Sequence, residues 1–276
     1  MKYIYLFLKG IFLGVCSILL YLPTPVSAET ITIAGTGDSQ LLLRQMAQVF
    51  QQQNPEAQIL VPNSVGSGGG IKLLQAGRSE LARIARPLKP KEKAEGLHYR
   101  TFAYSPIIFV ANMSTPCVKS VSAAEVVALF TGEINNWNQL GSCQDHKIYV
   151  ANREEGDSSK TVLEEKIPGV KEIKQLAGRT IYSTPETYDT LNRYEHSFGY
   201  LPASQIVKGT LTKFDYEGIA PTTENVQQGK YPLAVPLGIV WRGEPQGVAK
   251  QFIDYLFSPT AQQLMLKMNA VPALAE

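Results

Sequence analysis

The sequence predicts an α/β fold made of two lobes. Short strand patterns alternate with helical patterns from residue 30 onward, and two extended, proline-containing segments interrupt this alternation. Alternation with short loops favours parallel strands with helices on the faces of the sheet. We therefore expect each lobe to be a mixed sheet flanked by helices. A ligand would lie in the cleft between the lobes, where strand ends and helix N-termini converge.

The first lobe begins with a strand, a turn and a helix. Ile31 and Ile33 alternate with polar residues, and Gly35 ends the strand. Apolar residues then recur at helical spacing until Asn54-Pro55 stops the helix. The next predicted elements are a strand over 57–65, a turn at 66–70, a short helix over 71–77 and a strand over 81–88.

Two extended segments, near 104–110 and 230–240, are the expected crossovers between the lobes. Pro106 lies inside the first, and proline is confined to edge or irregular positions of a sheet because it has no N–H to donate. Two C-terminal helices, separated at Ser258-Pro259, should return to the first lobe. The expected limits are 29–107 plus 234–276 for lobe 1 and 108–233 for lobe 2.

Lobe 2 repeats the opening theme of a strand, a polar loop and a helix. The stretch "HKIYVANREEGDSSKTVLEEKI" carries this pattern. Before it, Ser122 and Glu125 have the spacing of a capping box, in which each side chain bonds a backbone N–H of the helix start. We therefore expect a helix to begin directly after Ser122.

The N-terminus has the pattern of a secretory signal peptide. Lys2 and Lys9 precede an apolar run, and the small residues Ser27 and Ala28 follow it. A membrane anchor is the alternative, but the run is shorter than the roughly 20 residues that a spanning helix needs. We expect residues 1–28 to be removed and the protein to be periplasmic.

Export makes a disulfide plausible between Cys117 and Cys143, the cysteines that remain after cleavage. The bridge would contribute about 3 kcal/mol in the chain-entropy model. Two unrelated buried thiols are the alternative.

Composition and motifs exclude several classes of function. The net charge of +2 argues against a nucleic-acid binder, which usually carries a basic stripe. The three histidines are far apart in the sequence and lack partners at metal-ligand spacing, so we expect neither a metal nor another cofactor. The stretch "GSGGGIK" has no glycine directly before Lys72 and is not a P-loop, and Gln40 stands where a dinucleotide loop has its third glycine.

Three loops, at 35–39, 66–70 and 153–159, each lead from a strand into a helix. A helix N-terminus offers unpaired N–H groups and a partial positive charge, so loops of this kind that converge would bind an oxyanion. The alternative is that each loop is a capped helix start, with Asp38 and Asp157 as N-caps. Arg86 and Arg153 are candidate charge partners for the anion. The candidate ligand-binding residues are Thr36, Gly37, Asp38, Ser39, Ser67, Gly68, Arg86, Arg153, Asp157, Ser158 and Ser159.

These stretches together resemble a known family. "IAGTG", "GSGGGIKLL", "ARIARPL", "LFTGEINNWNQLG", "REEGDSS" and "YPLAVPLGIV" occur in this order across residues 30–273. The chain is similar to the phosphate-binding proteins of ABC transporters, which have the two-lobe, type II periplasmic-binding-protein fold. The resemblance implies a monomer that binds phosphate or a similar oxyanion, passes it to a permease and its ATPase, and catalyses no reaction. A secreted phosphohydrolase and a phosphate sensor are the alternatives.

The chain departs from that family at the site itself. Ala85 stands where the family often has serine, Arg86 where some members have aspartate, and Asp157 where the loop has serine. Hydrogen phosphate carries a proton that a carboxylate can accept, whereas sulfate does not. One hypothesis is therefore that Arg86 supplies charge and Asp157 accepts this proton. The alternative leaves Asp157 as an N-cap turned away from the ligand.

Overall fold

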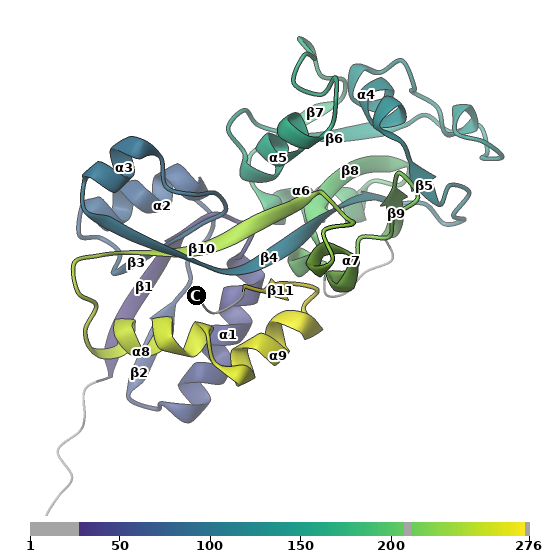
Figure 1. Cartoon of the computed structure of the whole chain (residues 1–276). Coiled ribbons are helices and arrows are strands. Elements are labelled where there is room, and N and C mark those ends of the chain that lie inside the picture. The colour runs from purple at the N-terminus through teal and green to yellow at the C-terminus, as the bar shows by residue number, and fades with distance from the viewer. Residues whose placement is uncertain (1–27, 207–210, 274–276) are drawn as a thin grey trace, which may run out of the picture.

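The computed structural model describes residues 28–206 and 211–273 (Figure 1). The predicted signal peptide, except for Ala28, lies outside these described residues. Within them, no helix combines the length and the apolar character needed to cross a membrane.

The strands form one mixed sheet, with eleven strands in the described part of the chain. The main path runs β2-β1-β3-β10-β4-β8-β6-β7, while β5, β9 and β11 attach beside it. β1 is parallel to β2 and β3, whereas β10 is antiparallel to β3 and β4. The predicted mixed α/β fold is thus confirmed. The strands are β1 (Glu29–Gly35), β2 (Ala57–Leu60), β3 (Leu81–Ile84), β4 (Leu97–Ala111), β5 (Ser120–Val121), β6 (Tyr149–Arg153), β7 (Arg179–Ile181), β8 (Ser197–Pro202), β9 (Thr212–Tyr216), β10 (Ala234–Arg242) and β11 (Val271–Pro272).

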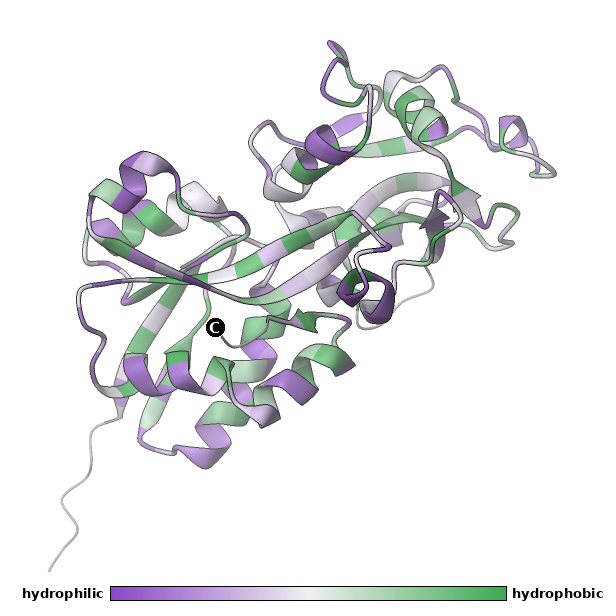
Figure 2. Ribbon diagram, in the orientation of Figure 1, coloured by the Kyte–Doolittle hydropathy of each residue, from purple (hydrophilic) through white to green (hydrophobic). Residues whose placement is uncertain are grey.

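Helices cover the sheet and pack their apolar sides onto it (Figure 2). The described helices are α1 (Gln40–Gln53), α2 (Gly66–Gln75), α3 (Pro90–Ala94), α4 (Ala123–Thr131), α5 (Ser158–Lys166), α6 (Thr184–Arg193), α7 (Thr223–Gln227), α8 (Gly247–Leu256) and α9 (Pro259–Lys267), with short 3₁₀ turns η1 (Trp137–Gln139) and η2 (Ala203–Gln205). The predicted capping box is confirmed, because Ser122 and Glu125 bond each other's backbone N–H at the start of α4.

The long strand β4 passes between two groups of elements (Figure 1). Its first part pairs with β10, and from Ile107 onward it pairs with β8 and β9. The group that contains β1–β3 and α1–α3 also holds α8 and α9, which pack beside α1. Phe252 of α8 meets Phe50 of α1 edge-to-face, with ring centroids 5.4 Å apart. We call the two groups lobe 1 and lobe 2; their limits at residues 107 and 234 stay predictions.

The glycine-rich stretch at 66–70 is not the turn that the sequence predicts. α2 begins at Gly66 and includes all of these glycines. The glycine at position 70 is explained by close packing of α2 against β1, since a Cβ there would lie 2.6 Å from the Cα of Gly35. Glycine here lets the helix approach the strand, which places Ser67 in the first turn of α2.

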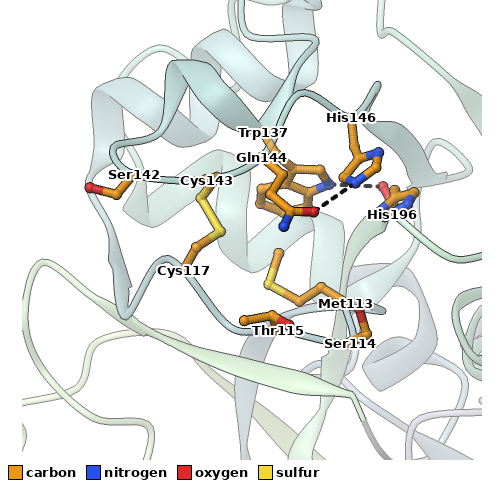
Figure 3. A pocket seen from close by; sticks show the side chains of 10 residues that line it. All are labelled: Met113, Ser114, Thr115, Cys117, Trp137, Ser142, Cys143, Gln144, His146 and His196. Carbon is orange, nitrogen blue, oxygen red and sulfur yellow. Dashed lines mark hydrogen bonds between the residues drawn. A yellow bond between two sulfur atoms is a disulfide. The ribbon is translucent and has the colours of Figure 1, made fainter.

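The predicted disulfide between Cys117 and Cys143 is confirmed (Figure 3). It lines a cavity of lobe 2 together with His146 and His196, which stack with ring centroids 4.0 Å apart. These two histidines are thus adjacent in space although they are 50 residues apart in the sequence, and the sequence analysis did not predict this pairing.

Candidate functional site

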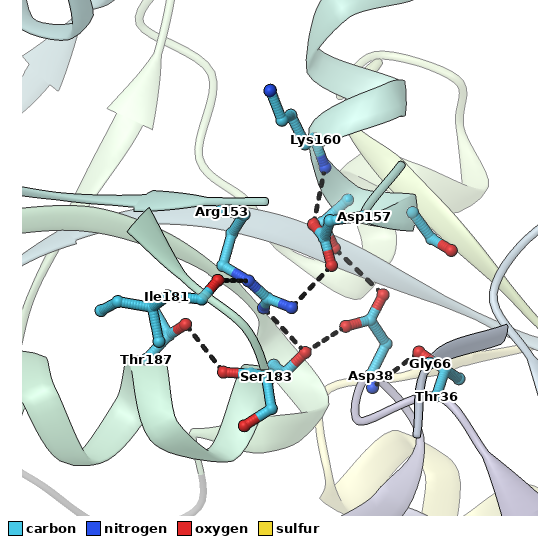
Figure 4. Close-up of polar contacts among 12 residues, drawn as sticks. Thr36, Asp38, Gly66, Arg153, Asp157, Lys160, Ile181, Ser183 and Thr187 are labelled. Carbon is cyan, nitrogen blue, oxygen red and sulfur yellow. Dashed lines mark hydrogen bonds and ion pairs between the residues drawn. The ribbon is translucent and has the colours of Figure 1, made fainter. Parts of the chain in front are cut away.

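The three predicted strand-to-helix loops meet between the lobes, where Asp38, Ser158 and Ser159 are buried and Ser67 is half-buried (Figure 4). From lobe 1, the Asp38 carboxylate accepts a hydrogen bond from the Ser159 hydroxyl of lobe 2 at 3.3 Å. The Ser67 hydroxyl lies 3.2 Å from the Ser158 hydroxyl. The first turns of α2 and α5 therefore face each other, as the anion-site hypothesis requires.

A fourth helix start, which the sequence analysis missed, joins these loops. Thr184 is the first residue of α6, and its hydroxyl donates to Asp38 Oδ1 at 2.5 Å. Arg153 Nη1 donates to the same hydroxyl oxygen at 2.9 Å. The stretch Ser183-Thr184-Pro185 was the available signal, because a serine cap followed by an early proline marks a helix N-terminus. We call Asp38, Ser67, Arg153, Ser158, Ser159 and Thr184 the cradle.

Asp38 is fully buried, and its side chain does not cap α1. Ser39 occupies the N-cap position instead, and its hydroxyl has no hydrogen-bond partner among the described residues. The alternative that made Asp38 a helix cap is therefore wrong. Burial raises the pKa of the Asp38 carboxyl to about 6, and repulsion by Asp157 adds to the shift. The charge of Arg153 and the hydroxyls of Thr184 and Ser159 act in the opposite direction.

Asp157 has two donors of its own. Its Oδ2 pairs with Arg153 Nη2 at 2.7 Å, and its Oδ1 accepts the backbone N–H of Lys160 at 2.9 Å. Asp157 is thus the N-cap of α5, as one of the two predicted alternatives has it. It is also the buried counter-ion of Arg153, whose Nε donates to the Ile181 carbonyl at 3.3 Å.

Arg86 faces another partner. Its guanidinium forms a two-pronged ion pair with Glu92 of α3, with N–O distances of 2.7 and 2.8 Å. Hydrogen bonding to Arg86 lowers the pKa of Glu92. In the described residues, the other polar contact of Arg86 is with the Pro87 carbonyl, and none joins it to the cradle. The backbone N–H of Ala85, directly before it, donates to Ser67 Oγ at 3.1 Å.

Arg83 is a buried arginine that the sequence analysis did not select. It lies in β3 with no exposed surface, and its donors reach the carbonyls of Ile33, Thr36 and Pro62 and the side chain of Gln40. Burial lowers the pKa of the Arg83 guanidinium to about 9, and Arg44 adds to this shift. Arg83 therefore remains a cation at neutral pH.

The remaining candidates of the first two loops frame the cradle. The Asp38 N–H donates to Thr36 Oγ1 at 3.2 Å. Gly37 lies against the start of α6, where a Cβ would come within 2.9 Å of Pro185 Cδ. Gly68 has free space beside it, since a Cβ there would meet no atom within 4 Å. The loops thus bring hydroxyls, Arg153 and the carboxylates of Asp38 and Asp157 together, a set that offers donors to an oxyanion and an acceptor for a proton that it carries.

Comparison with known proteins shows the family of the chain. A family model described as a PBP superfamily domain matches residues 23–260. The chain belongs to the PBP superfamily. Its relatives include the phosphate-binding protein PstS of Bacillus subtilis, which is 28% identical over 239 residues, 86% of this chain and 78% of that protein.

Solved structures of similar proteins show the same fold. One is a putative phosphate ABC transporter substrate-binding protein with bound phosphate from Clostridium perfringens. It is 26% identical with a TM-score of 0.80, covering 89% of this chain and 100% of that one. An ABC-type phosphate transport receptor from Vibrio cholerae is 24% identical with a TM-score of 0.65, over 89% and 100% of the two chains. The resemblance found in the sequence is confirmed.

Proposed function

We propose that this protein captures inorganic phosphate between its two lobes and delivers it to an ABC transporter. The observation that carries the proposal is the buried cradle, in which Asp38 of lobe 1 meets Ser159 and Thr184 of lobe 2. The names of the Bacillus relative and of the phosphate-bound Clostridium structure support phosphate as the ligand.

The cradle also explains how phosphate would be told from sulfate. Hydrogen phosphate carries a proton that it can donate, and fully ionised sulfate does not. A buried carboxylate that faces an anion without a proton is left unpaired and repelled, which disfavours sulfate. We assign the acceptor role to Asp38 rather than Asp157, because Asp157 is ion-paired with Arg153 and caps α5. Among the described residues, the Asp38 carboxylate accepts only from the neutral hydroxyls of Thr184 and Ser159, which can rotate away.

The cation of the site would be Arg153, whose charge the ion pair with Asp157 partly offsets. Its guanidinium is buried and lies within hydrogen-bonding distance of Thr184. Arg86 is held by Glu92 and would take part only if this ion pair opened. The proposed ligand-binding set is therefore the cradle together with the backbone amides of Gly37 and Ser39.

Ligand exchange would require the lobes to part. The cradle residues come from both lobes, and β4 and β10 are long strands that connect them. Rotation about these two strands would separate Asp38 from Thr184 and open the cleft, as in hinge-bending binding proteins. Closure on phosphate would restore these contacts around the ligand.

The setting of the protein is part of the proposal. The signal-like N-terminus and the Cys117–Cys143 disulfide support a location outside the cytoplasmic membrane. A permease with its ATPase would receive the phosphate from a monomeric binding protein. The proposed function is capture and delivery, with no covalent step.

Calorimetric titration of the purified protein tests this function. Phosphate, sulfate and molybdate are titrated separately at neutral pH into protein freed of bound phosphate. We expect phosphate to bind with a Kd of about 1 µM or tighter, and sulfate at least about 100-fold more weakly. Binding of phosphate no tighter than about 1 mM would contradict the proposal.

A further inference from the structure

Arg83 is a buried cation without a carboxylate partner. It is fully buried in β3, and none of the ion pairs in the described residues includes it. Burying a charge without a counter-ion is costly, so a strand position of this kind ordinarily carries an apolar side chain. The guanidinium therefore needs an explanation beyond packing.

The acceptors of Arg83 all belong to segments that lead into the proposed anion site. Nε donates to the Thr36 carbonyl at 2.8 Å, in the loop before α1. Nη2 donates to the Pro62 carbonyl at 2.8 Å, in the connection that leads to α2. A second link between these segments is the Val65 N–H, which donates to the Gly35 carbonyl at 3.0 Å. Arg83 thus ties the loop of Asp38 to the segment before Ser67.

The bond to the Thr36 carbonyl also sets the direction of the next amide. In a trans peptide the C=O and the following N–H point to opposite sides, and no peptide bond among the described residues is cis. Because Arg83 holds the Thr36 oxygen, the Gly37 N–H points away from Arg83. In the described part of the chain this N–H donates no hydrogen bond.

A matching arrangement holds the other side of the loop. The Asp38 carbonyl accepts from Ser204 Oγ at 3.2 Å and from Gln205 Nε2 at 2.9 Å, so the Ser39 N–H is turned away from these two residues. The Ser39 hydroxyl is buried and has no partner among the described residues. Two amides and one hydroxyl are therefore available next to the Asp38 carboxylate.

We propose that Arg83 is a positioning residue of the anion site, which orients the Thr36–Gly37 peptide so that the Gly37 N–H donates to the bound anion. This inference rests on the proposed capture of phosphate. Arg83 does not touch the ligand; it acts through the peptide that it holds. Gly37 lies against Thr184 and Pro185 of lobe 2, which places this amide at the boundary between the lobes.

The test uses phosphate with the wild-type protein and with Arg83→Met, Arg83→Lys and Arg242→Met. Arg242 is an exposed arginine of β10 and controls for the loss of one positive charge. We expect Arg83→Met to weaken phosphate binding at least tenfold, roughly the effect of a lost charge-assisted hydrogen bond. Arg83→Lys keeps the positive charge but lacks the planar guanidinium, so its phosphate affinity should lie between those of the wild type and Arg83→Met. Arg242→Met should bind as the wild type does.

Amide NMR separates positioning from a general loss of structure. In the wild type, saturating phosphate should move the Gly37 amide proton downfield, together with those of Ser67 and Ser159. In Arg83→Met the response of Gly37 should be lost, while Ser67 and Ser159 still respond. A merely structural role would weaken all three responses alike.

Three results would overturn the inference. One is a Gly37 amide that phosphate leaves unmoved in the wild type, which needs no variant to fold. Another is a folded Arg83→Met protein that binds phosphate within about twofold of the wild type. If Arg83→Met does not fold, the inference is overturned instead by Arg83→Lys binding phosphate as tightly as the wild type. Failure of the wild type to bind phosphate at all would instead reject the proposed function, and this inference with it.

Discussion

The Asp38 carboxylate and the Thr184 hydroxyl are 146 positions apart in the sequence and 2.5 Å apart in the structure. This contact joins lobe 1 to lobe 2 at the centre of the cradle. Asp38 brings a buried negative charge into a site that we propose for an anion, and it does so beside Arg153. We therefore propose that Asp38 determines which anions the site accepts and how binding and stability respond to pH.

Replacing Thr184 by valine should weaken the cradle without removing a charge. Valine keeps the shape of threonine but takes the donor from Asp38 Oδ1 and the acceptor from Arg153. Leaving buried polar groups unpaired costs about 1–3 kcal/mol each, so phosphate affinity should fall at least tenfold. Calorimetry measures this, with Thr190→Val on the same helix as the matched control. Equal losses in the two variants would speak against a special role for Thr184.

Asp38 should make the stability of the protein depend on pH. Burial raises the pKa of Asp38 from its ordinary value of 3.8 to about 6, so the folded state binds the proton more tightly than the unfolded chain does. This contribution to stability is fully present below about pH 4 and is lost as the pH rises through about 6. The loss amounts to about 3 kcal/mol.

Urea unfolding at about pH 4 and about pH 7 measures this contribution in Asp38→Asn and in the wild type. Between about pH 4 and about pH 7 the wild type should lose about 3 kcal/mol of unfolding free energy through Asp38, and Asp38→Asn should not. The stability of Asp38→Asn minus that of the wild type should therefore increase by about 3 kcal/mol. Asp189→Asn, which changes an exposed carboxylate of α6, controls for the loss of a surface charge. A difference between Asp38→Asn and the wild type that stays constant with pH would show that Asp38 has no raised pKa.

Asp157→Asn separates the two roles predicted for this residue. Removing the partner of the buried Arg153 should destabilise the protein by about 3–5 kcal/mol. It should also lower the pKa of Asp38, because the negative charge of Asp157 helps to raise it. The preference for phosphate over sulfate should persist, and NMR titration of the Asp38 carboxyl with calorimetry would show both effects. Loss of this preference would return the acceptor role to Asp157.

The disulfide should stabilise lobe 2 without affecting the ligand. Cys117→Ser together with Cys143→Ser should lower the free energy of unfolding by about 2–4 kcal/mol. The bridge lies in a cavity with His146 and His196 rather than at the cradle, so phosphate affinity should stay within about twofold. Thermal unfolding and calorimetry of the double variant and the wild type check this. A large change in affinity would mean that the bridge acts on the lobe interface.

The general form of the site was predictable because its elements are local in the sequence. A strand, a short polar loop and a helix start can be identified from periodicity and small residues, and such loops gather where strand ends meet. The loops of Asp38, Ser67 and Arg153 were found in this way. Thr184 was not, because its loop follows a strand of only three residues and contains no glycine beside Ser183.

The sequence did not reveal which groups the candidate charged side chains contact. Arg86 stood at a family position and was selected, yet Glu92, six residues later, pairs with it. Arg83 sat in a strand pattern where a charged residue suggests a solvent face, but the residues of β3 are buried on both faces. The pairing of Arg86 and the burial of Arg83 depend on how helices and loops pack over the sheet, and hydrophobic periodicity does not encode this packing.

Sulfate binding as a function of pH tests the central claim most directly, since sulfate stays fully ionised from about pH 5 to about pH 8 while Asp38 titrates. In the wild type, calorimetry should show sulfate affinity rising at least tenfold as the pH falls through about 6, because protonated Asp38 no longer repels the anion and can donate to it. In Asp38→Asn, sulfate should bind more tightly at about pH 8 and with little dependence on pH. Sulfate binding that is equally weak at every pH in both proteins would contradict the account.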